Sequence, residues 1–287
     1  MKAPDVDYVA PRSLEEALRC LAHTENARVL AGGQSLMAML NMRFAFPDCL
    51  VDINRIPGLA YIEDDGQTVR IGAMTRQREV EFSDLIRSRL PILHEAVLNV
   101  GHRQTRNRGT VGGSLCQLDP SAEIPTIAMA LDAQIHIDSV RRRRTLSMAE
   151  FPADYMTPAL EPDEMVTGVS LQPWDAGHGW SFLEFSRRHG DFAIASAAVL
   201  MQFEGDGRVG RCAITLGGVA SAPVRVARAE AALLGTRAED ADIDAAAALC
   251  AEVEAASDAY VPGWYRQRLA RGLVGRAVRQ ARSRAIR

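Results

Sequence analysis

Two glycine clusters have the residue types and the spacing to bind a phosphate group. They are Ala31-Gly32-Gly33-Gln34-Ser35-Leu36, and Thr110-Val111-Gly112-Gly113-Ser114 with Asp119-Pro120 and Glu123 close behind. Glycine lacks a side chain, so a phosphate oxygen can come within hydrogen-bonding distance of the backbone N–H groups. Together the clusters could hold one diphosphate from two sides, with serine and threonine hydroxyls as further donors. For the first cluster taken alone, an ordinary turn is the alternative.

The elements around the first cluster form a predicted β-loop-α crossover. Ser13 and Glu16 have capping-box spacing and precede apolar residues at helical intervals, which predicts that a helix begins there. Residues 27–30 are typical of a strand, 35–40 of a helix and 49–53 of a further strand. The first cluster therefore lies between a strand and a helix.

The middle of the chain mixes strands with helices. A strand pair is predicted at 59–63 and 68–71, helices over 75–100 with a stop at Pro91, then a helix at 126–131 and a strand at 134–138. Residues 102–125 between them are predicted to form a long loop. Such a loop is uncommon in a compact domain unless it binds a ligand.

A second domain is predicted to begin near Trp174, where a polar, glycine-containing segment interrupts the pattern. The patterns beyond it predict strands at about 181–187, 193–203 and 211–217 and helices at about 227–234, 242–255 and 262–282. The fold class is therefore α+β. G-x-G-x-x-G is absent from every predicted strand-to-helix turn, which argues against a Rossmann fold.

Composition limits the classes of protein to which this chain can belong. At 287 residues and 47% hydrophobic, the chain can bury a large core. Its 33 Lys plus Arg against 36 Asp plus Glu give a net charge of −3, without the excess positive charge that nucleic-acid binding needs. The basic run 141–144 lies between an alternating strand and a helix-like segment, so it is predicted to be a solvated hairpin tip without function.

The cysteines and the apolar segments give two further expectations. The five cysteines are scattered and form no C-x-x-C pair, so no metal or iron–sulfur cluster is expected on this chain. No segment approaches the roughly 20 apolar residues that span a bilayer, and the first residues lack the apolar segment of a secretory signal. We therefore expect a cytoplasmic protein without membrane insertion.

The glycine clusters and two later blocks resemble a known family. The blocks are AGGQSL at 31–36, HRQTRNRGTVGGSLCQLDPSAEIP at 102–125, SRRHGDFAIASAAV at 186–199 and ITLGGVASAPVR at 214–225. In this order they resemble the FAD-binding medium subunit of the xanthine dehydrogenase and carbon monoxide dehydrogenase group of molybdenum hydroxylases. The similarity extends from about Pro4 to about Arg279.

This resemblance implies a fold, a cofactor and partners. The fold would be the p-cresol methylhydroxylase type of FAD-binding fold, with subdomains at 1–57 and 58–173 and a C-terminal α+β domain at 174–287. The chain would take electrons from a small subunit with [2Fe–2S] clusters onto FAD and pass them to an external acceptor. A large molybdopterin-containing subunit would oxidise the substrate, which this sequence does not identify.

The resemblance also implies the residues that bind FAD. These are Ala31, Gly32, Gly33, Gln34, Ser35, Leu36, Thr110, Val111, Gly112, Gly113, Ser114, Glu123 and Phe192. Glu123 stands where the family usually has Asp and would hold hydroxyls of the adenosine half. Phe192 stands where relatives often have an aromatic residue near the flavin ring, although core packing is its alternative. Asp119 is expected to fix its loop, and no catalytic residue is expected because the cofactor performs the redox step.

Two other classes of function stay open. A stand-alone flavin-dependent oxidase or dehydrogenase would act on its own small-molecule substrate. A cofactor-free scaffold would keep the fold without binding FAD. A visible spectrum of the purified chain separates the second of these from the flavoproteins.

Overall fold

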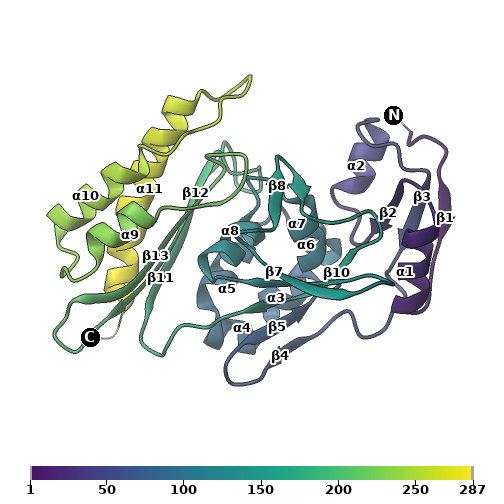
Figure 1. The fold of residues 1–287 in the computed structure, drawn as a ribbon. Helices are drawn as coiled ribbons and strands as arrows, with labels where there is room; N and C mark the ends of the chain where they lie inside the picture. Colours follow the sequence, from purple (N-terminus) through teal and green to yellow (C-terminus); the bar gives the residue numbers. More distant parts are fainter. Residues whose placement is uncertain (1, 286–287) are drawn as a thin grey trace.

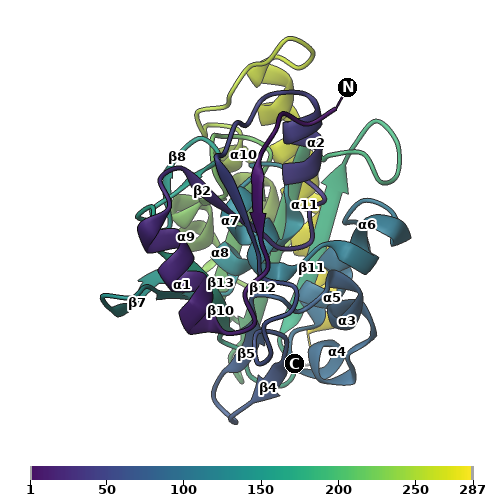
Figure 2. The ribbon, with the colours of Figure 1, turned by 90° about the vertical axis from the view of Figure 1, so that its right-hand side faces the viewer.

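The computed structural model describes residues 2–285 and confirms the predicted α+β fold class (Figure 1). Three principal sheets follow one another along the chain. The N-terminal sheet lies at one end of the molecule, the C-terminal sheet with its helices at the other, and the middle sheet between them (Figures 1 and 2). Among the described residues, no helix is both long and apolar enough to cross a bilayer.

The N-terminal sheet is parallel, in the order β1-β3-β2. Its elements are β1 (Asp7–Val9), α1 (Leu14–His23), β2 (Ala27–Leu30), α2 (Leu36–Asn41) and β3 (Cys49–Asp52). Ser13 caps α1 by accepting a hydrogen bond from the Glu16 N–H, as predicted. Because β2 and β3 are parallel, the chain must cross over between them, and this crossover carries the first glycine cluster.

The middle sheet is antiparallel, in the order β4-β5-β10-β6-β7. Its strands are β4 (Ile62–Asp64), β5 (Val69–Gly72), β6 (Gln134–Asp138), β7 (Arg143–Ser147) and β10 (Met165–Leu171), beside the small pair β8 (Pro152–Asp154) and β9 (Thr157–Pro158). The helices between β5 and β6 are α3 (Gln77–Phe82), α4 (Asp84–Arg89), α5 (Pro91–Val97), α6 (Arg103–Arg108), α7 (Val111–Gln117) and α8 (Glu123–Ala130).

Two predictions for this region were wrong. Residues 102–125 are mostly helical rather than a loop, because α6, α7 and the start of α8 lie there. Thr110 caps α7 by accepting from the Gly113 N–H at 3.0 Å, so the second glycine pair forms the first turn of a helix despite its low helix propensity. The segment after Arg144 begins as strand β7 instead of a helix.

The C-terminal domain is an antiparallel sheet, β11-β12-β13-β14, with three helices on one face (Figure 1). Its elements are β11 (Gly179–Phe185), β12 (Ala195–Phe203), β13 (Val209–Gly217), β14 (Val224–Arg225), α9 (Ala227–Leu233), α10 (Asp240–Cys250) and α11 (Gly263–Arg284). A Cβ atom on Gly179 would lie 1.8 Å from the Ala281 carbonyl oxygen, so glycine lets α11 lie directly on the sheet. Helix α8 packs against β12 and β13 and joins this domain to the middle one.

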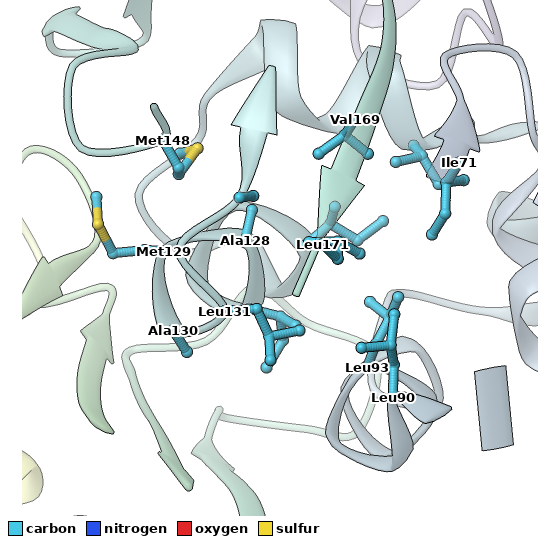
Figure 3. Packing of buried hydrophobic residues seen from close by; sticks show 14 of the residues in the cluster. Ile71, Leu90, Leu93, Ala128, Met129, Ala130, Leu131, Met148, Val169 and Leu171 are labelled. Carbon is cyan, nitrogen blue, oxygen red and sulfur yellow. The ribbon is translucent and has the colours of Figure 1, made fainter. Parts of the chain in front are cut away.

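The largest core cluster lies around β5, β10, α5 and α8 (Figure 3). Ile71 and Val169 are register partners on neighbouring strands, and both are almost fully buried. Leu93 of α5 and the buried Leu131 close the same cluster. Side chains of this size each contribute about 1.5–3 kcal/mol when fully buried. This cluster therefore gives the rigid support on which α7 and α8 present their cavity-facing residues.

Candidate functional site

A cavity of about 1380 Å³ extends along the first and middle sheets. All of the residues predicted to bind FAD line it except Val111, whose side chain is 2% exposed and lies in the core. Loops after β2 and before β12 and the N-terminal ends of α2, α7 and α8 reach the cavity. A cavity of this size with a few polar groups is typical of a cofactor site.

The first glycine cluster presents unpaired backbone donors. Its carbonyls have partners, because Gly33 C=O accepts from the Met37 N–H at 3.2 Å and Ser35 C=O accepts from the Met39 N–H at 3.0 Å. Within residues 2–285, the N–H groups of residues 32–36 have no protein partner. Buried or half-buried N–H groups are rarely left unpaired, so this loop and the start of α2 are suited to an anionic ligand.

The backbone N–H groups of residues 111–114 in the second glycine cluster are not free to bind a ligand, which differs from the prediction. These groups have partners inside the fold: Val111 donates to Thr75 C=O (3.0 Å), Gly112 to Ala73 C=O (2.9 Å), Gly113 to Thr110 Oγ1 (3.0 Å) and Ser114 to Thr110 C=O (3.1 Å). This cluster can therefore donate to a ligand mainly through the hydroxyls of Thr110 and Ser114, which both belong to cavity-lining residues. The diphosphate site would be asymmetric, with amides on one side and hydroxyls on the other.

Two of the predicted glycines have a packing role that their sequence context does not show. A Cβ atom on Gly32 would lie 2.2 Å from the Arg108 carbonyl oxygen, and one on Gly112 would lie 2.6 Å from Ala73 Cβ. Real Cβ atoms do not come so close, so only glycine permits these contacts. Gly32 thus packs the first cluster against Arg108 and Gly109, the residues directly before the second cluster.

Glu123 is a buried carboxyl group at the first turn of α8, and it lines the cavity. Burial, with a smaller contribution from the charges of Glu184 and Asp119, raises its pKa to about 8. At neutral pH the group is therefore mostly protonated and can both donate to and accept from hydroxyl groups. Asp119 accepts from the Ser121 N–H at 2.9 Å, which confirms its predicted role in fixing the loop.

Phe192 is 72% exposed and lines the cavity, which contradicts core packing as an alternative for this residue. It follows Gly190, whose φ of +87° is accessible mainly to glycine. A Cβ atom on Gly190 would lie 2.3 Å from the His102 ring, so this turn lies directly against the start of α6. The turn thus places an exposed aromatic ring at one end of the cavity.

The cavity lining also includes residues that were not predicted to form part of the site. Arg141 lines the cavity and pairs with Asp163 at 2.7 Å, while Arg142 and Arg144 pair with Glu164, whose side chain is 1% exposed. Although burial opposes it, the hydrogen bond from Arg144 leads the interactions that lower the pKa of Glu164 to about 2. The basic run lies at the tip of the β6-β7 hairpin with Arg141, Arg142 and Arg143 exposed, which confirms the predicted solvated hairpin tip. Its ion pairs with Asp163 and Glu164, which the sequence did not indicate, form an ion-paired wall of the cavity.

Glu184 on β11 is a second carboxyl group that sequence reasoning missed. Burial raises its pKa to about 7, and its Oε2 atom is buried without a hydrogen-bond partner among the described residues. It is the register partner of Ser196 on β12, whose Oγ atom is likewise unpartnered. The register between β11 and β12 brings these two groups together, and a pattern of residue types within one strand does not show this register.

We expect Glu184→Gln to stabilise the chain at pH 8 and to have little effect near pH 4. The folded state keeps the Glu184 proton up to a pKa of about 7, whereas the unfolded state releases it near the ordinary value of 4.5. The contribution of the Glu184 carboxyl to the free energy of unfolding therefore falls as pH rises from 4.5 to 7. Because the group is only partly buried, we expect a gain of about 1 kcal/mol at pH 8.

Urea unfolding at both pH values measures this difference. Glu63→Gln is the control, because Glu63 is an exposed residue of β4. An equal gain at pH 4 and pH 8, or the same gain in the control, would show that burial of the Glu184 carboxyl is not its cause.

Comparison with known proteins agrees with this geometry along the whole chain. Residues 4–174 match the FAD binding domain in molybdopterin dehydrogenase, and residues 180–281 match the CO dehydrogenase flavoprotein C-terminal domain. The 6-hydroxypseudooxynicotine dehydrogenase complex subunit alpha of Paenarthrobacter nicotinovorans is 39% identical over 287 residues, with 99% of this chain and 97% of that protein covered. The carbon monoxide dehydrogenase medium chain of Hydrogenophaga pseudoflava is 36% identical, with 98% of each chain covered.

A solved structure shows the same fold. The structure of carbon monoxide dehydrogenase from Hydrogenophaga pseudoflava superposes on all of this chain with a TM-score of 0.96 at 36% identity, covering 100% of the matched chain. Fold, cavity and unpaired loop amides thus define an FAD-binding flavoprotein. The chain belongs to the family of FAD-binding medium subunits of carbon monoxide dehydrogenase and xanthine dehydrogenase-type oxidoreductases.

Proposed function

We propose that this chain is the electron-transfer subunit of a heteromeric molybdenum hydroxylase. In this role it takes electrons from [2Fe–2S] clusters of a small subunit onto FAD and passes them to an external acceptor. The proposal rests above all on one observation. Residues 32–36 present a row of unpaired N–H groups in a cavity of the matched FAD-binding fold. Relatives named as medium chains of dehydrogenases support the proposed assembly with a small and a molybdopterin-containing large subunit.

The residues present fit FAD, and each group would have a distinct task. The N–H groups of residues 32–36 would hold the diphosphate from one side, and the hydroxyls of Thr110 and Ser114 from the other. The mostly protonated Glu123 would bond hydroxyl groups of the cofactor. Phe192 would contact the flavin ring. FAD supplies the redox chemistry, so the chain's own contribution is to bind and orient it.

The domain division predicted from the sequence forms part of this proposal. Residues 1–57 carry the amide-rich segment, residues 58–173 carry the hydroxyls and Glu123, and residues 174–287 carry Phe192. Each of the three segments would therefore contribute its own part of the cofactor site. The proposed role needs no general acid or base from this chain.

We expect FAD to be bound noncovalently and to be released completely by acid or heat denaturation. Cys116 lines the cavity, but burial raises the pKa of its thiol to about 12, so it is not the reactive thiolate that attachment would need. Chromatography of the supernatant after precipitation identifies the released flavin. Flavin that stays with the polypeptide, or release of FMN instead of FAD, would contradict this expectation.

Purification of the tagged chain from its native host tests the proposed assembly. We expect iron, molybdenum and FAD to co-purify with it, in a complex that contains two further polypeptides. The same tagged chain expressed alone should contain FAD without either metal. Recovery of the chain from its host as a metal-free flavoprotein would favour the stand-alone oxidase or dehydrogenase.

A further inference from the structure

A chain of hydrogen bonds joins the two glycine segments without passing through the cavity. It begins at Asn54, two residues after β3. The Asn54 Nδ2 atom donates to the Ala31 carbonyl at 2.8 Å, and the Asn54 Oδ1 atom accepts from Arg76 Nη2 at 2.7 Å. Asn54 therefore connects the first glycine segment to an arginine of the middle sheet's subdomain.

Arg76 continues the connection to the second segment. Its Nη1 atom donates to the Arg108 carbonyl, two residues before Thr110. That same carbonyl oxygen is the atom against which Gly32 packs. One guanidinium thus bonds both Asn54, which holds the first segment at Ala31, and the carbonyl of Arg108, just before the second segment. Its planar, multiple-donor geometry permits this, and a lysine ammonium would do it less well.

Asp52 holds the Asn54 side chain in a fixed orientation. The Asp52 Oδ1 atom accepts from the Asn54 N–H at 2.9 Å and from Asn54 Nδ2 at 2.6 Å, and the other Asp52 oxygen accepts from the Tyr8 hydroxyl. With these partners the Asn54 amide has both of its ends bonded. A side chain held in this way acts as a rigid spacer.

We propose that Asn54 and Arg76 form a clasp that sets the distance between the two phosphate-binding segments, so that both are positioning residues for the FAD diphosphate. Neither residue lines the cavity, so neither would touch the cofactor. The first segment follows β2 of the N-terminal sheet, whereas the second begins α7, which packs on β5 and β10 of the middle sheet. A diphosphate held by amides of one and hydroxyls of the other needs their spacing fixed in advance. The inference rests on the proposed role of the glycine segments.

A double-mutant cycle on FAD affinity tests the clasp. The full chain is stripped of flavin, and FAD is titrated into wild type, Asn54→Ala, Arg76→Ala and the double variant. We expect each single change to raise the dissociation constant about ten-fold. We expect the double change to raise it no further, because both single changes break the same connection. ADP, which carries the diphosphate without the flavin ring, should lose affinity by the same factor.

Two further variants separate positioning from general destabilisation. Asn54→Ser removes the bonds to Ala31 and Arg76 without placing a second carboxylate beside Asp52, so we expect weaker FAD binding with an unchanged unfolding temperature of the flavin-free chain. Arg70→Ala is the matched control, because the Arg70 guanidinium lies over the Tyr61 ring in the same subdomain. We expect its FAD affinity to equal that of wild type. If Arg76→Ala does not fold, Arg76→Lys, which keeps the charge, replaces it in the cycle.

The outcomes distinguish the clasp from the glycine site itself. Additive losses in the cycle, unchanged ADP affinity, or losses matched by an equal fall in stability of the flavin-free chain would overturn the clasp. If the clasp variants bind FAD with wild-type affinity and Gly33→Val loses FAD, the clasp is overturned and the glycine site is supported. Unchanged FAD affinity in Gly33→Val would remove the basis of both.

Discussion

Replacing Gly33 by valine is expected to abolish FAD binding while most of the fold survives. Gly33 has a φ of +74°, which a β-branched residue adopts only under strain. A Cβ atom there would lie 3.2 Å from Met37 Cγ and 3.5 Å from Leu30 Cδ1, and the γ-methyl groups of valine extend beyond the Cβ atom. With the backbone strain, we expect this crowding to move the loop. Movement displaces the N–H groups of residues 32–36. We expect the FAD dissociation constant to rise at least about 100-fold, or about 2.7 kcal/mol.

Gly58→Val is the matched control for this experiment. Gly58 has a φ of +78°, close to that of Gly33, but a Cβ atom there would meet nothing within 4 Å, and the residue does not line the cavity. Valine at position 58 therefore introduces the same backbone strain at a site without ligand contact. We expect unchanged FAD affinity with a loss of stability of about 1–2 kcal/mol. Equal loss of FAD in both variants would show that strain alone explains the effect.

The parts of the fold that depend on local pattern could be predicted from the sequence. The strand predicted at 27–30 is β2, and the helix predicted at 35–40 is α2 within one residue at each end. Capping residues, apolar spacing and alternation are encoded within a few residues of each other, so the crossover that carries the first glycine segment follows directly from them. Strands β11, β12 and β13 of the C-terminal sheet were predicted for the same reason, whereas the two-residue β14 was not.

The parts that depend on distant contacts could not be predicted. Gly112 and Gly113 favour a loop by their propensity, yet the carbonyls of Ala73 and Thr75 bind N–H groups of this segment and stabilise its helical turn. The sequence thus indicated residues that line the cavity but not which of their atoms stay free for a ligand. The ion-paired wall at Arg141 and the clasp at Asn54 have the same origin, because their partners lie on other elements.

The second prediction with a large expected effect concerns the partner subunits, because the proposed role needs electrons from another protein. We expect the chain expressed alone to bind FAD, to be reduced by dithionite, and to leave the native complex's substrate unoxidised. Adding the iron–sulfur and molybdopterin subunits should restore substrate-dependent reduction of the flavin. The physical reason is that the chain has the residues to bind and orient FAD, whereas the site that oxidises the substrate would belong to the large subunit.

Steady-state oxidation of the complex's substrate by the purified, metal-free chain is the most direct measurement of this account. The chain is first loaded with FAD, and its flavin content and bleaching by dithionite are verified, so that inactivity cannot come from an empty site. We predict no turnover above background from the isolated chain, and full turnover once the two partner subunits are added. Turnover by the isolated chain at the rate of the native assembly would contradict the account and identify a stand-alone flavoenzyme.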